Sequence, residues 1–182
     1  EEKGSAFSVY GSVKNRPARI IYLEETQITT MQKVVKDSAI IGADGKFSLK
    51  TDAKEESIFN LRLDNDGYPY VSMVNDAGKI TINADFKNEK EFYSVSGSVA
   101  SQGLKDYLTK SGDMMRLLYD FNKELDSLKG IQADSTSIQN AEEKRNTASG
   151  ELKNYTQQSV QEAKSPALAI FILSTYQGMA NN

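Results

Sequence analysis

The sequence predicts an α+β fold: an antiparallel β-sandwich or partly open barrel of about seven or eight strands, followed by about three α-helices. Apolar residues recur at every second position through much of residues 7–95, as in β-strands. Near residue 98 their spacing changes to three and four residues, as in amphipathic helices. We therefore expect an antiparallel β domain at 1–98. The helical segment at 99–182 should pack on it or lead to a C-terminal module outside the chain.

Each expected strand is a short run bounded by a turn signal. Asp44-Gly45, Asp66-Gly67 and Ala77-Gly78 supply three of these turns. The run 31–41, which begins at Met31, can hold one strand or two. The expected strands are residues 7–13, 19–23, 31–41, 46–50, 57–63, 68–74, 79–84 and 92–95. Short strands at such spacing are typical of a sandwich.

The stretch 37–50 (DSAIIGADGKFSLK) predicts a hairpin rather than a ligand loop. A two-residue loop at Asp44-Gly45 would put Gly42 opposite Phe47. A three-residue loop, with the glycine in the left-handed conformation, would put Ile41 opposite Phe47 instead. We prefer the second register because it gives Phe47 a large apolar partner. Exposure of Ile41, with the preceding isoleucine buried instead, would contradict this choice.

Two long helices are expected after the strands. The first should run from about residue 99 to Gly130, a plausible stop, and Gly112 should weaken it by roughly 1 kcal/mol relative to Ala. Its apolar stripe consists of Leu104, Tyr107, Leu108, Met114, Met115, Leu118, Phe121, Leu125 and Leu128. The second should run from Asp134 or Ser135 to about Lys164. Because its apolar stripe is thin, we expect it to be more exposed and more mobile than the first.

Ser165 and Pro166 predict the N-cap and the first position of a third helix, which spans 166–177. This helix is apolar nearly all round, which a surface helix does not require. Two explanations stay open. Either it is buried between the sheet and the other helices, or its cover lies in chain outside this sequence.

The chain has 182 residues and contains neither Cys nor His. A thiol nucleophile, an internal disulfide, a Cys/His zinc site and a Ser-His-Asp triad are therefore excluded within it. The commonest general base near neutral pH is missing as well. We expect the chain itself not to be an enzyme, and we assign no catalytic, cofactor-binding or metal-binding residue.

The charge balance excludes a further class of partner. With 22 basic and 25 acidic residues the net charge is −3, so the chain lacks the basic excess that nucleic-acid binding requires. The longest apolar run, 167–173, is too short to cross a bilayer. The chain starts EEKGS, without Met, and ends YQGMANN. We expect a processed or trimmed piece of a longer protein.

The segment 64–67 (DNDG) is the best candidate for a metal loop. A calcium-binding EF-hand needs D-x-[DN]-x-[DN]-G and a Glu at the twelfth position. Here one spaced ligand is missing, and the twelfth position from Asp64 is Asn75. We favour a tight turn, in which Asn, Asp and Gly accept left-handed backbone angles.

Other polar and aromatic residues have a functional and a structural interpretation. Paired carboxylates for glycoside chemistry could be drawn from five residues, all of which adjoin predicted turns: Asp44, Asp64, Asp66, Asp76 and Asp85. An aromatic platform for sugar or peptide could be built from Tyr68, Tyr70, Phe92 and Tyr93, although such residues also pair across sheets. The charged run 142–145 (EEKR) is expected to be a solvated helix face with i,i+3 and i,i+4 pairs.

The sequence also resembles one known group of domains through a series of short motifs in a fixed order. The motifs are FSVYGSV (7–13), IIYL (20–23), DSA (37–39), DGKF (44–47), GKITI (78–82), VSGS (95–98) entering the helix at 104–107, and SPA (165–167). Together they resemble the domains of unknown function that precede the thioredoxin-like module in Bacteroidetes-type envelope thiol-disulfide oxidoreductases. The resemblance covers most of the chain.

The resemblance implies a non-catalytic N-terminal interaction or positioning domain. The C-x-x-C module of such proteins follows this domain, so no redox residue is transferred to the chain. Implied partners are the C-terminal thioredoxin-like domain, client or reductase proteins, and a second copy in a homodimer. The implied location is the periplasm or cell envelope, with membrane attachment only through a lipid anchor outside this chain. The alternative is an independent β-sandwich module that binds glycan or peptide on the cell surface.

Overall fold

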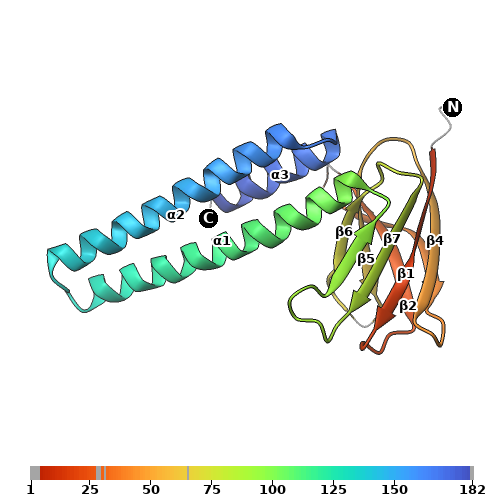
Figure 1. Ribbon diagram of the computed structural model, residues 1–182, viewed down its shortest axis with the longest axis horizontal. Helices are drawn as coiled ribbons and strands as arrows, with labels where there is room; N and C mark the ends of the chain where they lie inside the picture. Colours follow the sequence, from red (N-terminus) through yellow and green to blue (C-terminus); the bar gives the residue numbers. More distant parts are fainter. Residues whose placement is uncertain (1–4, 28–29, 31, 65, 181–182) are drawn as a thin grey trace. The chain divides into compact units, whose positions relative to one another are not determined.

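The computed structural model describes residues 5–27, 30, 32–64 and 66–180, and these residues form eight strands and three helices (Figure 1). The strands are β1 (Ser5–Lys14), β2 (Ile20–Thr26), β3 (Lys33–Ile40), β4 (Lys46–Ala53), β5 (Ile58–Leu63), β6 (Val71–Val74), β7 (Lys79–Asp85) and β8 (Tyr93–Ser96). The helices are α1 (Val99–Gly130), α2 (Ser135–Glu162) and α3 (Pro166–Ala180). The predicted α+β class is confirmed. Met31, Asn65 and the chain ends, on which some predictions fall, lie outside the described residues.

The strands form two four-stranded sheets that do not close into a barrel, so the architecture is a sandwich. One sheet has the order β4-β1-β7-β8, and the other has the order β3-β2-β5-β6. The expectation of purely antiparallel pairing is wrong for one described pair, because β1 and β7 run parallel. The reason is topological. Because β2 lies in the second sheet, it does not pair with β1. The edge of β1 that faces away from β4 is therefore free to pair with β7, which runs in the same direction as β1.

The predicted hairpin in residues 37–50 is a corner between the sheets, so both proposed registers are wrong. β3 pairs with β2, and β4 pairs with β1. Some local predictions still hold. Gly45 has a φ of 80°, and Ile41 packs against the core while Ile40 is 77% exposed. A carboxylate oxygen of Asp37 accepts a hydrogen bond from the Lys50 amide at 2.7 Å, which ties β3 to β4 without a strand ladder.

The hydrophobic core fills the space between the two sheets. Alternate residues of β1, β2, β4, β5 and β7 point inward, as period two requires. The rings of Phe7 and Phe59 meet edge to face, with their centroids 4.7 Å apart. The fully buried side chains of these strands are Val9, Ile21, Leu23, Leu49, Phe59, Leu61, Leu63, Ile80 and Ile82.

Two glycines are required by close backbone approaches around this core. A Cβ on Gly11 would lie 1.6 Å from the carbonyl oxygen of Ile82, the residue opposite it on β7. A Cβ on Gly45 would lie 2.5 Å from the carbonyl oxygen of Val13, and its positive φ already disfavours other residues. Both glycines belong to the motifs that carry the sequence resemblance.

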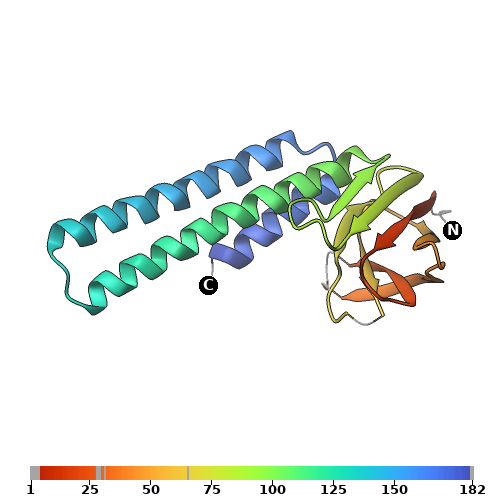
Figure 2. The same cartoon turned by 60° about the horizontal axis from the view of Figure 1, so that its bottom comes forward.

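The described residues divide into two compact units. One consists of Glu1–Lys105 with Ala163–Phe171, and the other of Asp106–Glu162 with Ile172–Asn182. Within the second unit, α1 and α2 run side by side in opposite directions (Figures 1 and 2). The buried residues of α2 are few and mostly small, so its expected exposure is confirmed: Ala141, Ala148, Leu152 and Thr156.

The third helix begins where the sequence predicts and is three residues longer than expected. The Ser165 hydroxyl oxygen accepts the Leu168 amide at 3.1 Å, and the Glu56 carboxylate accepts the Ala167 amide at 3.1 Å. Ala167, Leu168 and Ile172 are buried, whereas Ile170 and Leu173 are each almost half exposed. Within the part of the chain that the structure describes, no helix has the length and apolar character of a bilayer span.

Candidate functional site

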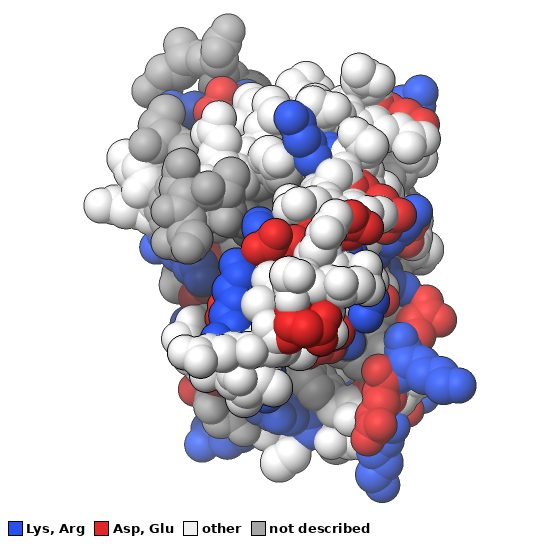
Figure 3. Space-filling view, turned by 90° about the vertical axis from the view of Figure 1, so that its left-hand side faces the viewer, with Lys and Arg blue, Asp and Glu red and all other residues white. Residues whose placement is uncertain are grey.

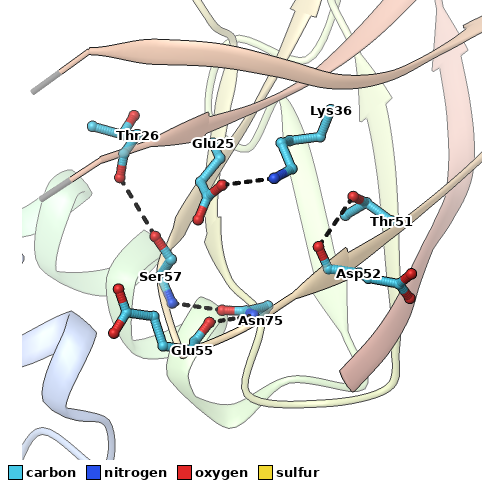
Figure 4. Close-up of polar contacts among 8 residues, drawn as sticks. All are labelled: Glu25, Thr26, Lys36, Thr51, Asp52, Glu55, Ser57 and Asn75. Atoms are coloured by element: carbon cyan, nitrogen blue, oxygen red, sulfur yellow. Dashed lines mark hydrogen bonds and ion pairs between the residues drawn. The ribbon is translucent and has the colours of Figure 1, made fainter. Parts of the chain in front are cut away.

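Asp64 and Asp66, in the segment predicted to be a tight turn rather than a metal loop, each contact an arginine of the connection between β1 and β2. A carboxylate oxygen of Asp64 accepts the Arg19 amide at 3.1 Å, and Asp66 pairs with Arg16. Asn75, at the twelfth position, accepts the Ser57 amide at 2.7 Å and donates to the Glu55 carbonyl at 3.1 Å (Figure 4). Across residues 5–27, 30, 32–64 and 66–180 there is no group of three acidic residues that could hold a metal ion.

The other three acidic candidates each have a separate structural task. Asp44 accepts the Lys46 amide at 3.1 Å and closes the corner between the sheets. Asp76 accepts the Ser98 hydroxyl and, at 2.9 Å, the Ala100 amide, so it caps the start of α1. Asp85, the last residue of β7, accepts the Lys87 amide at 3.0 Å at the start of the following loop.

The four aromatic candidates are not one exposed platform. Tyr68 is 83% exposed and has no ring contact among the described residues. Tyr70, Phe92 and Tyr93 instead join Phe86 in a row of touching rings, with centroids 4.9 to 6.1 Å apart. The Tyr70 hydroxyl is buried without a hydrogen-bond partner, and burial raises its pKa. Phe92, at 37%, is the most exposed member of this row.

Phe92 lines a polar hollow of about 470 Å³ on the outer face of the sheet that contains β1, β7 and β8. Three positions in register form its floor: Ser12 lies opposite Asn83, and Asn83 lies opposite Ser94. The loop residues Asn88 and Glu91 complete the wall beside Phe92. This hollow is the candidate functional site of the β-sandwich unit.

Asp85 and Phe92 are candidates from the sequence alone, whereas Ser12, Asn83 and Ser94 are not. All three lie at alternate strand positions next to buried residues, so a period-two reading places them on the outer face. The period-two pattern does not show that the three residues are neighbours, because their proximity depends on the parallel pairing of β1 and β7.

The loop between β7 and β8 is held in place by its own hydrogen bonds. The Asp85 amide donates to the Phe92 carbonyl at 2.7 Å, and the Glu91 amide donates to the Asn88 side chain at 3.2 Å. The Phe86 amide donates to the Lys14 carbonyl at 3.1 Å, which joins the loop to β1. These hydrogen bonds tie the backbone on either side of the loop, including the Phe92 carbonyl, to β7 and β1.

The carboxylates of the hollow are held in their ionised form. A hydrogen bond from the Asn15 side chain, at 2.5 Å, and another from the Lys87 amide lower the pKa of Asp85. The Lys105 ammonium, 2.6 Å from Glu91, lowers the pKa of that carboxyl. At neutral pH both groups accept hydrogen bonds and do not donate protons.

The two four-stranded sheets and the three helices define an α+β sandwich protein with a polar surface hollow. A comparison with protein families matches residues 7–104 to "Domain of unknown function (DUF4369)", and the chain belongs to this family. The match covers the sandwich and the first turns of α1. A search of curated proteins found no match.

Proposed function

We propose that this chain is the non-catalytic interaction or positioning domain of a larger cell-envelope thiol-disulfide oxidoreductase. Its redox C-x-x-C module would lie in a thioredoxin-like domain outside the chain. The family membership and the order of the short motifs support this proposal. The absence of Cys and His from the sequence also supports a non-catalytic role, rather than a redox role, for this domain. In the proposal the protein is located in the periplasm or cell envelope and is held there by a lipid anchor.

One observation carries the interaction role: the paired helices beyond the family match leave a partly apolar groove uncovered. The groove lies between α1 and α2 and has a volume of about 660 Å³. Leu117, Phe121 and Ala148 provide its apolar surface, and Leu117 is 46% exposed. Glu143, Lys144 and Glu151 form a charged rim. A partly apolar strip with a polar rim is typical of a protein contact surface.

The charges around this groove argue against nucleic acid as the partner. Lys129 pairs with Glu142 at 2.8 Å, and Lys144 pairs with Glu124 at 3.2 Å, so the run 142–145 pairs across to α1 rather than mainly along α2. On the face drawn in Figure 3, basic and acidic side chains are interspersed. A client protein, a reductase or a second copy of the chain therefore suits the surface better than a polyanion.

The test uses the protein expressed from its whole reading frame. Two rates are measured: the reaction of the reduced protein with a small aromatic disulfide, and its reduction of a protein disulfide such as that of insulin. Deletion of this domain, or Leu117→Glu in the groove, should leave the first rate unchanged and slow the second several-fold. Tyr119→Glu is the matched control, because Tyr119 is 65% exposed on the same helix but does not line the groove.

If Leu117→Glu and Tyr119→Glu slow the reduction of the protein disulfide equally, the groove is not the interaction surface. The oligomeric state of the protein with and without the domain is measured by light scattering. If deletion of the domain changes neither of the two rates nor the oligomeric state, the proposed interaction role is wrong.

A further inference from the structure

The hollow beside Phe92 contains hydrogen-bonding groups that the fold itself does not use. The Ser12 hydroxyl donates to the Asn83 side-chain oxygen at 2.9 Å. Among the described residues, the Asn83 side-chain nitrogen and the Ser94 hydroxyl have no hydrogen-bond partner. These groups come from adjacent strands, in register, so their spacing is fixed by the sheet. The floor therefore offers donors and acceptors at set positions.

The wall of the hollow adds an apolar surface of a particular kind. Phe92 contacts Phe86 and Tyr93, with ring centroids 6.1 and 4.9 Å away, yet it stays 37% exposed. The hydrogen-bonded loop between β7 and β8 holds it there. A flat aromatic ring beside oriented polar groups suits a ligand that has apolar C–H groups on its faces and hydroxyl groups at its edges.

The net charge of the hollow decides the class of ligand. Lys14 lies opposite Asp85 in the register of β1 and β7, and Glu91 is already paired with Lys105. The formal charges of Lys14, Lys105, Asp85 and Glu91 therefore sum to zero, so the hollow has no excess charge that would select a phosphate or a cation. The volume of about 470 Å³ lies within the range of small-molecule sites. A neutral, hydroxyl-rich molecule fits this balance.

We propose that this hollow binds a neutral saccharide, with one sugar ring against Phe92 and its hydroxyls bonded to Asn83, Ser94 and Asp85. This inference goes beyond the interaction role proposed above and does not depend on it. An extended peptide is the weaker occupant. A peptide would use the backbone edge of β8, whereas the unpaired groups here are side chains on the face of the sheet.

The experiment is an NMR titration of the ¹⁵N-labelled chain with maltotetraose, cellotetraose and chitotetraose, each raised to about 20 mM, well above the millimolar affinity expected of an open site. At least one of them should shift the amide signals of Asn83, Ser94 and Phe92. Phe92→Ala and Asn83→Ala should each weaken binding about tenfold. Asn83 is exposed on the outer face, so its variant tests the site without disturbing the aromatic row. Tyr68→Ala, an exposed aromatic residue outside the hollow, should bind like the wild type.

Three results would overturn the inference: no shifts with any of these sugars, shifts that survive Asn83→Ala, or loss of binding in Tyr68→Ala. A parallel titration with a neutral Ser/Thr/Asn hexapeptide provides the fourth. If the peptide alone shifts the signals of β8, the site is a peptide edge and not a sugar site. None of these results bears on the groove between α1 and α2, so the two proposals fail independently.

Discussion

Replacing Gly11 by Ala is expected to destabilise the sandwich strongly. The added Cβ would lie 1.6 Å from the Ile82 carbonyl oxygen, about 1.8 Å short of the 3.4 Å at which ordinary contact begins. Ile82 is fully buried on β7, and β8 holds β7 on its other side, so the clash cannot be relieved by a side-chain rotation. The strands must separate. The loss of about two ladder hydrogen bonds and the overpacking together cost about 3 to 5 kcal/mol.

This cost can be measured by thermal unfolding followed by circular dichroism and calorimetry. For a chain of this length, each kcal/mol lowers the midpoint by about 2–4 °C, so Gly11→Ala should lower it by roughly 6 to 20 °C. Gly78→Ala is the matched control. It has no atom within 4 Å of the added Cβ and no positive φ, so it should be neutral or stabilise by about 0.4–1 kcal/mol. If the midpoint of Gly11→Ala falls no more than that of Gly78→Ala, the close approach of β7 does not require glycine at position 11.

Three further predictions concern charged groups, each read by the same unfolding measurements. Asp76→Ala removes a cap of α1 and should cost about 1 kcal/mol, while Asp76→Asn should cost less; equal losses would contradict the capping role. Arg62→Met leaves the buried Glu24 carboxylate without its 2.7 Å partner and should cost roughly 2–3 kcal/mol, part of which Glu24→Gln should restore in the double variant. A hydrogen bond from the Ser137 hydroxyl lowers the pKa of Asp134. The ionised Asp134 carboxylate therefore stabilises the fold at pH values above its ordinary pKa of 3.8, and this stabilisation is lost as the pH falls through the lowered pKa. Asp134→Ala should therefore flatten the acid limb of a pH–stability curve, and an unchanged limb would disprove this.

Local patterns predicted most elements because local physical chemistry determines them. The start of α3 follows from Ser165 and Pro166, and the left-handed corner follows from Gly45. The failures concern pairing between distant segments. Nothing near residues 37–50 shows that β3 and β4 lie in different sheets, because that depends on β2 and β1 as partners.

The candidate site shows the same division. Phe92 and Asp85 were identifiable one at a time, as an aromatic residue and a turn carboxylate. Their neighbours Ser12 and Asn83 are 71 residues apart, and only the parallel β1–β7 pair brings them into contact. Short polar residues at strand positions carry no signal of their own, so the hollow could be recognised only in the fold.

The most direct test of the proposed function is a thiol count on the protein expressed from its complete reading frame. The fully reduced, unfolded protein is titrated with a thiol reagent before and after oxidation. If the proposal is right, the protein has two thiols, both outside residues 1–182, that disappear together on oxidation as a C-x-x-C disulfide forms. A protein with no thiols, or with thiols that do not pair, would contradict it.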